Sequence, residues 1–356
     1  MKSLLRLSAL ATVLSATQCA ALAQGAPTVD AATRRQVVDS AIEQMKQHYV
    51  FPEMSRQVEA ALRQQWQAKA FDHLDDAKAF ADKLTAELQA VTRDKHIRVR
   101  YSAFALPPRT DATPSAEEDA RYRRDERLRN YGVERVERLE GNIGYIDLRG
   151  FAPTEWAGET LAAAMTLVAH TDALIVDLRK NGGGDPGTVA FMTSYLFDAR
   201  THLNNLYWRE GDRTEQFHTH DWVPGKRFGQ KKPVYVLTSN RTFSGAEEFG
   251  YNLKNLKRAT LIGETTGGGA NPGDLFPLTP HFGMFVPTGR AISPVTKTNW
   301  EGTGVEPDVK VPSAQAFDVA LAMALKQVIA AEPDAERRTA LQQRLAEVEK
   351  ATLAAR

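Results

Sequence analysis

The sequence contains almost no cysteine. Among its 356 residues there is one, Cys19, close to the N-terminus. A single cysteine excludes a disulfide within the chain and a zinc site built from several thiolates. An excess of charge of one sign is also missing, because 45 lysines and arginines face 44 aspartates and glutamates, a formal net charge of +1. The composition therefore gives no electrostatic reason to expect nucleic acid or an anionic membrane surface as a partner.

The N-terminus lacks an apolar run long enough to cross a membrane. Its apolar stretch, residues 7–14, is far shorter than the roughly 18–20 residues that a spanning helix needs. Lys2 and Arg6 lie before this stretch, and the small residues of Ala21-Leu22-Ala23 follow it. This order is typical of an export signal. We predict a signal peptide over residues 1–23 and a periplasmic or secreted mature chain without stable membrane insertion.

Removal of that segment would also remove Cys19 and so exclude a cysteine nucleophile. A lipoprotein would need small residues directly before Cys19, where Gln18 stands.

Residues 30–92 carry apolar side chains at helical spacing in three segments, separated by breaks at residues 51–52 and 72–75. The period changes to two at residues 97–101, which predicts a strand with His96 at its mouth. We therefore expect a helical N-terminal domain over residues 24–105. Because His96 lies beside a domain boundary, a cleft is expected next to it.

The remaining chain alternates between strand and helix patterns. Residues 106–130 are rich in proline and charge and are interpreted as a linker with room for a short helix. Residues 131–356 then form the second domain. Strands are predicted at 133–139, 142–148, 173–178, 233–237 and 260–262, and helices at 155–169, 245–256, 317–328 and 335–354. The pattern indicates an α/β fold.

Ser244 stands where a strand pattern changes to a helix pattern. Backbone N–H groups at the start of a helix point toward a developing oxyanion, and the small Gly245 lets a carbonyl approach closely. This place suits a nucleophile. The alternative is a helix cap, in which Glu247 completes a capping box with Ser244.

Two glycine triplets follow predicted strands. Gly182-Gly183-Gly184 comes after the buried strand and suits a phosphate cradle or an oxyanion hole, because its N–H groups are exposed. A Walker lysine and a GxGxxG pattern are both missing, which argues against nucleotide binding. Gly267-Gly268-Gly269 is the second triplet. His218 and His220 form a His-x-His pair without a third candidate ligand, so neither a metal nor another cofactor is expected.

Four stretches in this order resemble the S41 serine peptidases. They are Asp177–Gly184, Thr238–Gly250, Gly263–Gly269 and Gly304–Asp308. The resemblance implies a crotonase-like fold of ββα units with Ser244 as nucleophile. It also places a glycine of the first triplet opposite the serine, which makes the N–H groups of Gly183 and Gly245 the expected oxyanion hole. No PDZ-like segment separates the two predicted domains.

The general base is implied by the branch that the chain resembles. The processing proteases use a lysine after the Gly263 stretch, and no lysine lies between Arg258 and Lys297 here. The branch of the tricorn core and the interphotoreceptor retinoid-binding protein uses histidine and glutamate, which match His96 and Glu301. Glu264 is the alternative carboxylate.

The resemblance thus implies an exported peptidase that hydrolyses peptide or protein substrates through Ser244, His96 and Glu301. The retinoid-binding branch offers a second hypothesis, a carrier of a hydrophobic ligand, of retinoid or fatty-acid type, on the peptidase scaffold. A carrier has no need of all three residues together. The oligomeric state stays open.

Overall fold

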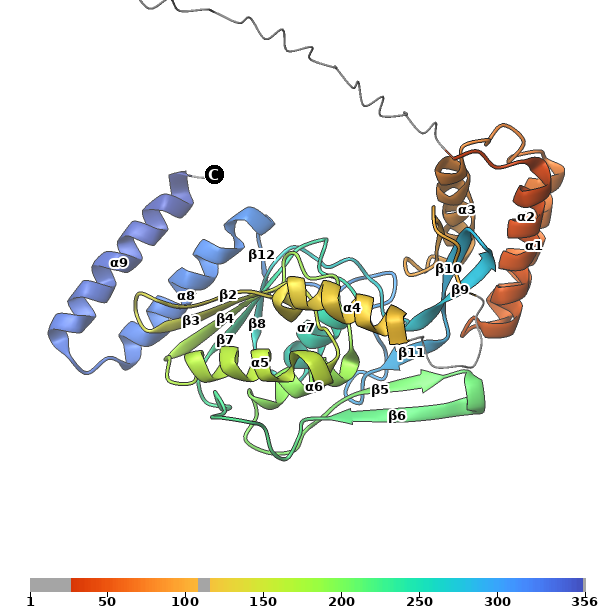
Figure 1. The fold of residues 1–356 in the computed structure, drawn as a ribbon. Coiled ribbons are helices and arrows are strands. Elements are labelled where there is room, and N and C mark those ends of the chain that lie inside the picture. The colour runs from red at the N-terminus through yellow and green to blue at the C-terminus, as the bar shows by residue number, and fades with distance from the viewer. Residues whose placement is uncertain (1–26, 108–115, 355–356) are drawn as a thin grey trace, which may run out of the picture.

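A six-stranded sheet is the largest element of the computed structural model, which describes residues 27–107 and 116–354 (Figure 1). The strand order is β12-β8-β7-β4-β3-β2, and all neighbours are parallel except the β2–β3 hairpin. The strands are β2 (Val133–Leu139), β3 (Ile143–Leu148), β4 (Ala173–Asp177), β7 (Val234–Thr238), β8 (Thr260–Gly263) and β12 (Val309–Lys310). The central strands β4 and β7 are buried along their whole length, as expected for parallel strands covered on both faces.

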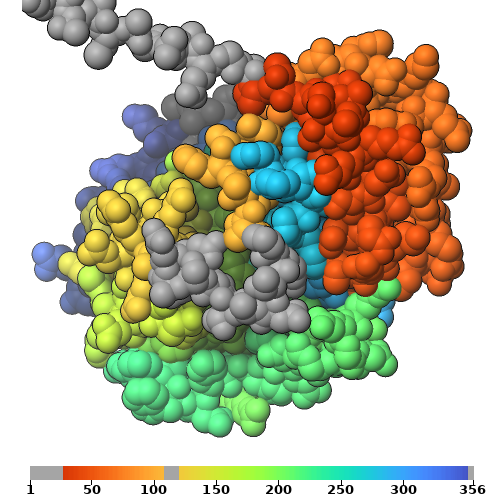
Figure 2. Space-filling view, turned by 45° about the vertical axis from the view of Figure 1, so that its right-hand side comes forward, coloured from red at the N-terminus to blue at the C-terminus, as the bar shows by residue number. Residues whose placement is uncertain are grey.

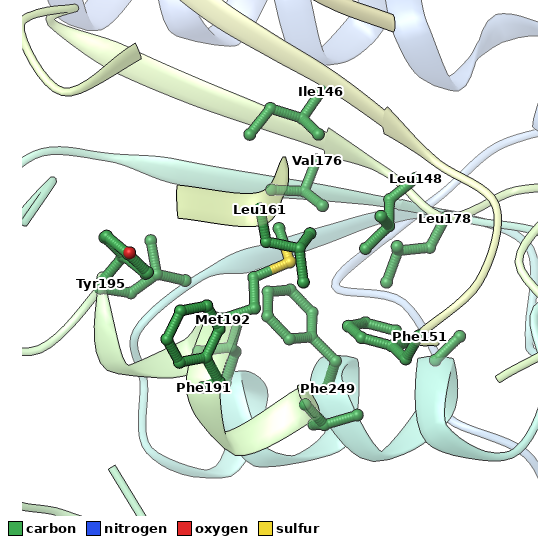
Figure 3. Packing of buried hydrophobic residues seen from close by; sticks show 14 of the residues in the cluster. Ile146, Leu148, Phe151, Leu161, Val176, Leu178, Phe191, Met192, Tyr195 and Phe249 are labelled. Atoms are coloured by element: carbon green, nitrogen blue, oxygen red, sulfur yellow. The ribbon is translucent and has the colours of Figure 1, made fainter. Parts of the chain in front are cut away.

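Helices cover both faces of this sheet (Figure 1). They are α5 (Thr154–Val168), α6 (Pro186–Ser194) and α7 (Gly245–Asn255) on one face, and α8 (Ala316–Ala331) with α9 (Ala335–Ala354) on the other. Figure 3 shows the first core, where Phe151, Phe249 and Met192 gather under the strands. Among the described helices, the segment Ser313–Ala331 is long and apolar enough to cross a membrane by length and composition. It contributes Ala320 and Leu325 to the second core.

The N-terminal unit contains three helices and one strand, but its core also needs a later part of the chain. The elements are α1 (Ala31–His48), α2 (Pro52–Gln67), α3 (Ala77–Thr92) and β1 (Arg98–Tyr101). Strand β1 pairs antiparallel with β10 (Phe282–Pro287), which pairs with β9 (Gly273–Thr279). Phe276, Phe282 and Met284 are buried among the residues of the three helices. In Figure 2 the cyan strands β9 and β10 lie between this helical unit and α4.

A third small sheet and a separate helix complete the described fold. The sheet has the order β11-β5-β6, from β5 (His202–Trp208), β6 (Arg213–His218) and β11 (Gly289–Ile292). Helix α4 (Ala116–Leu128) lies in the segment that was predicted as a linker. Because β11 follows β10 directly, this sheet continues from the one that carries the N-terminal unit.

The predicted α/β fold with a preceding helical unit is confirmed. Each predicted strand and helix of the second domain has a counterpart within a few residues, and a helix is present in the linker segment. The predicted signal peptide lies outside the described residues. The domain boundaries stay a prediction, and the pairing of β1 with β10 means that the helical unit and the later chain share one sheet.

We predict that Phe282→Ala destabilises the whole protein, because this ring contacts Phe80 of α3 edge to face at 5.7 Å and is 2% exposed. The free energy of unfolding should fall by about 3–5 kcal/mol, the usual effect of truncating a buried phenylalanine. Urea denaturation measures it, with Leu275→Ala as control, because Leu275 lies on the neighbouring strand and is 52% exposed. A loss below about 1 kcal/mol would show that the helices do not depend on β10.

Candidate active site

Ser244 occupies a strained turn between β7 and α7. Its backbone angles are φ 54° and ψ −124°, a combination that non-glycine residues rarely adopt and that clusters at functional sites. The Ser244 N–H donates to Oε2 of Glu247 at 2.8 Å. Ser244 both caps helix α7 and lines a cavity. The two interpretations of Ser244 from the sequence, a helix cap and a nucleophile position, are therefore compatible.

Glu247 holds this turn in place from inside the protein. Its buried carboxylate also accepts the N–H groups of Gly268 at 2.6 Å and Gly269 at 2.9 Å, and the Thr266 hydroxyl at 2.5 Å. Burial raises the pKa of Glu247, and these donors oppose the rise. The nucleophile turn and the second glycine triplet are thereby fixed to one side chain. From the sequence, Glu247 was identified only as a capping partner.

The first glycine triplet packs directly against Ser244. A Cβ atom on Gly183 would lie 2.7 Å from both Ser244 Cβ and Gly245 N, and φ of Gly183 is +103°. Only glycine fits such a close approach. The Gly183 N–H donates to Oδ1 of Asn181 at 2.8 Å. The role of Gly183 in an oxyanion hole stays a prediction. It requires the Gly183 N–H to donate to a substrate oxygen as well as to Asn181.

His96 lies two residues before β1, and its ring packs beside the nucleophile turn. The ring centroid is 4.6 Å from that of Phe243, the residue before Ser244, and 5.8 Å from that of Phe285. The His96 side chain is 9% exposed. His96 and Ser244 line the same cavity, which measures about 1380 Å³. The structure therefore brings together two residues that are far apart in the sequence.

Two carboxylates lie behind the His96 ring. One ligand atom each from Asp94, His96 and Glu301 lies within 4.8 Å of the other two, and Asp94 Oδ1 is 3.8 Å from His96 Nδ1. Among the described residues, the two ring nitrogens of His96 and Oε1 of Glu301 have no hydrogen-bond partner. Because most buried polar atoms in proteins have a partner, unpartnered atoms of this kind need an explanation such as a functional role. Glu301 thus lies close to His96, and its role stays a prediction; Asp94 was not singled out from the sequence.

The other carboxylate oxygens are held by fixed donors. Asp94 Oδ1 accepts the His96 N–H at 3.0 Å, and Oδ2 accepts Asn271 Nδ2 at 2.8 Å and the Tyr49 hydroxyl at 3.4 Å. Glu301 Oε2 accepts the Ala270 N–H at 2.5 Å. Nitrogen and carboxylate donors this close have the types that bind divalent cations. Most of the carboxylate oxygens of Asp94 and Glu301 already accept hydrogen bonds from the protein. The two side chains are therefore held in place, which suits the positioning of the imidazole.

Burial shifts the pKa of all three groups toward their neutral forms. Desolvation, with the charge of Arg98 nearby, lowers the pKa of His96 to about 4. Desolvation raises the pKa of Asp94 to about 6, and desolvation together with the Asp94 charge raises that of Glu301 to about 8. A neutral imidazole is the form that can accept a proton. The charge of Asp94 adds to the rise at Glu301 because two buried like charges are unfavourable.

Glu264 is not part of this cluster. Its oxygens accept the N–H groups of Ser313 at 3.0 Å and Asn240 at 3.3 Å. The Ser313 N–H is the main cause that lowers the pKa of Glu264. This geometry makes Glu264 an anchor between the loop after β7 and the segment before α8.

The two histidines of the His-x-His pair contact different partners. His218 stacks on His202 with ring centroids 4.5 Å apart, and His220 packs edge-on to Phe191 at 5.8 Å.

Two family profiles match the chain. Residues 142–311 match the profile of peptidase family S41, and residues 21–131 match the N-terminal domain of peptidase S41 in eukaryotic IRBP. The second match contains His96 and the helical unit, and the first contains Ser244 and Glu301. The two matches leave only residues 132–141 between them.

Curated relatives include carboxyl-terminal-processing peptidases. The chain is 26% identical over 187 residues to carboxyl-terminal-processing peptidase 1, chloroplastic, of Arabidopsis thaliana, which covers 51% of this chain and 36% of the relative. It is 28% identical over 180 residues to the carboxy-terminal-processing protease of Bartonella bacilliformis, covering 49% and 40% respectively. The chain thus spans less than half the length of these relatives.

Solved structures share the fold. A lipoprotein from Streptococcus agalactiae superposes with a TM-score of 0.52 at 14% identity, covering 83% of this chain and 96% of that one. A candidate peptidase from Parabacteroides merdae also gives 0.52, at 19% identity, covering 78% and 90%. These likenesses show the fold. The two profile matches, which together cover 281 of the 356 residues, show that the chain belongs to peptidase family S41, a family of serine-type peptidases.

Proposed function

We propose that this chain is an exported serine peptidase in which Ser244 attacks the peptide bond, His96 is the general base and Glu301 orients the base. The observation that carries the proposal is the meeting of the strained Ser244 and the buried His96 in one cavity, with a carboxylate cluster behind the imidazole. A hydrophobic-ligand carrier needs neither the strained serine nor an unpartnered imidazole. Export rests on the N-terminal signal pattern of the sequence.

The proposed reaction follows the charges of the site. His96 accepts the Ser244 hydroxyl proton as Oγ bonds to the substrate carbonyl carbon, and it then gives the proton to the leaving amine. Glu301 stabilises the imidazolium that forms in between. The oxyanion is proposed to bind the N–H groups of Gly183 and Gly245. Water then hydrolyses the acyl-enzyme ester and restores the Ser244 hydroxyl.

Asp94 and Glu301 are proposed to act on His96 from different directions. Asp94 accepts the backbone N–H of His96, so it fixes where the residue sits. Glu301 has a free Oε1, so it is the carboxylate that can accept a ring N–H. The raised pKa values of both groups mean that burial favours their neutral forms.

We predict that a fluorophosphonate probe labels the wild-type protein at Ser244. Ser244→Ala should abolish labelling, and His96→Ala should reduce peptide turnover on the order of 10³-fold or more, because the two residues act as one unit. Lys297→Ala is the control for a lysine base and should keep wild-type rates. Activity that survives His96→Ala but is lost in Lys297→Ala would show that Lys297, and not His96, is the general base.

We predict that Glu301→Gln keeps the fold but lowers turnover by roughly two to four decades, because the amide no longer stabilises the imidazolium. Glu264→Gln should lower the melting temperature more than the rate, because Glu264 accepts two backbone N–H groups and so anchors the loop after β7. Melting curves and peptide hydrolysis on both variants separate the roles. Glu264 replaces Glu301 as the carboxylate that orients His96 if Glu264→Gln is inactive with an unchanged melting temperature while Glu301→Gln is active.

We predict that activity rises with pH over about 6 to 8, the range set by the raised pKa values of Asp94 and Glu301, rather than near the pKa of His96. Asp94→Asn removes one of the charges that raise the pKa of Glu301, so the rise should move to lower pH. The pH profile of kcat/KM measures both. A rise near pH 4 that Asp94→Asn leaves in place would exclude the carboxylate pair as its origin.

The raised pKa of Glu301 also predicts how the free energy of unfolding changes with pH. The pKa of Glu301 is higher in the folded chain, about 8, than its ordinary 4.5, so its favourable contribution is present below about pH 4.5 and is lost as the pH rises through 8. Glu301→Gln should therefore become more stable relative to the wild type over this range, as urea denaturation at several pH values would measure. A stability difference that does not change with pH would contradict the raised pKa.

A further inference from the structure

One wall of the active-site cavity is a sheet face that carries arginines. Along β1 the side chains alternate, so that Val99 is buried in the helical core while Arg98 and Arg100 lie on the opposite, exposed face. Both arginines line the cavity that contains Ser244. In the strand pairing, Arg98 lies opposite Phe285 and Arg100 lies opposite Gly283 of β10. Phe285 and Gly283 also line the cavity.

The charges around this cavity are unbalanced. Lys95, Arg98, Arg100 and Arg241 line it, against the acidic residues Asp185 and Asp274. Asp185 is occupied as the cap of α6, where it accepts the N–H and the hydroxyl of Thr188 at 2.7 and 3.0 Å. The cavity therefore presents an excess of positive charge beside the nucleophile.

The two arginines of β1 are available to a ligand. Arg98 Nε makes one long hydrogen bond, 3.4 Å, to the Lys95 carbonyl, and Lys95 Nζ is occupied by the Gly267 carbonyl at 2.5 Å. Within the described residues, neither Arg98 nor Arg100 has an acidic partner. A guanidinium pairs with a carboxylate through two parallel hydrogen bonds, and such a pair is stronger in a cavity than on an open surface.

We propose that Arg98 and Arg100 bind a carboxylate of the substrate and so select peptides that carry one near the cleaved bond. The inference rests on the proposed peptidase function. Residues Phe285 and Leu275 on the same sheet face add an apolar contact beside the arginines. The carboxylate comes either from an acidic side chain or from the free carboxyl terminus of the peptide, and these sources are separated below.

Binding is measured first, without hydrolysis. Fluorescence anisotropy of labelled peptides on Ser244→Ala compares glutamate with glutamine side chains, and a C-terminal acid with its amide. We expect the carboxylate-bearing peptide to bind about 10-fold more tightly at low salt, the effect of a charge-assisted hydrogen bond. The difference should shrink in high salt, because exposed charges are screened. A preference in the first pair identifies a side chain, and a preference in the second identifies the terminus.

Variants assign the preference to the arginines. Adding Arg100→Gln to Ser244→Ala should remove most of the difference, and Arg100→Glu should turn it toward lysine-bearing peptides. Arg100→Lys should keep part of it, because the charge stays but the planar fork is lost. Arg56→Gln is the control, since Arg56 is an exposed arginine on α2 that forms an ion pair with Glu53 and does not line the cavity. Melting curves verify that each variant is folded.

The outcomes separate this inference from the peptidase function. Equal binding of all four peptides, or a preference that persists when Arg98 and Arg100 are both glutamine, overturns the inference. If the wild type also hydrolyses neutral peptides in that case, the peptidase function stands without it. If the wild type hydrolyses none of the peptides but Ser244→Ala binds the carboxylate through Arg100, the carboxylate site stands and the peptidase function fails.

Discussion

The carboxylate of Glu247 is the interaction on which the site depends. It accepts N–H groups from Ser244, Gly268 and Gly269, together with the Thr266 hydroxyl, all from within the protein. Ser244 needs this support, because its φ of 54° is unfavourable for a residue with a side chain. The same carboxylate fixes the loop on which the base rests, since a Cβ on Gly269 would lie 2.7 Å from His96 Cε1. One buried acid thus sets the nucleophile and the surroundings of its base together.

The distance between base and nucleophile is controlled by a second feature, the sheet that joins the two parts of the chain. His96 belongs to the helical unit and Ser244 to the α/β part, so their geometry is only as rigid as the contact between these parts. That contact is the β1–β10 pairing and the core around Phe282 and Met284. Two hydrogen bonds from Arg209, to the Tyr49 and Lys46 carbonyls, add a polar contact on the same side. A core substitution there can therefore change the active site without touching it.

The sequence predicted the parts of this protein that are encoded locally. The change from period two to helical spacing located Ser244 at its turn, and the glycine triplets located the loops that pack around it. Strands β5, β6 and β9 to β12 were not predicted. The β5–β6 and β9–β10 pairs are local hairpins with a short apolar pattern, whereas the pairing of β10 with β1 and of β11 with β5 is long-range. Asp94, two residues before His96, received no role from the sequence, since only the fold brings it to Glu301 and Asn271. The sequence showed Glu247 as a cap, and only the structure reveals its three further donors.

His96 lies between groups of opposite charge. Carboxylates of Asp94 and Glu301 lie behind the imidazole, and the guanidinium of Arg98 lies on the cavity side and helps to lower the pKa of His96. Desolvation is the main cause that lowers the pKa of His96, and the positive charge of Arg98, which opposes an imidazolium, adds to it. A substrate carboxylate bound at Arg98 would neutralise the opposing charge alone. The pKa of His96 would then rise, and the base would become stronger only when a substrate that fits the arginines is bound.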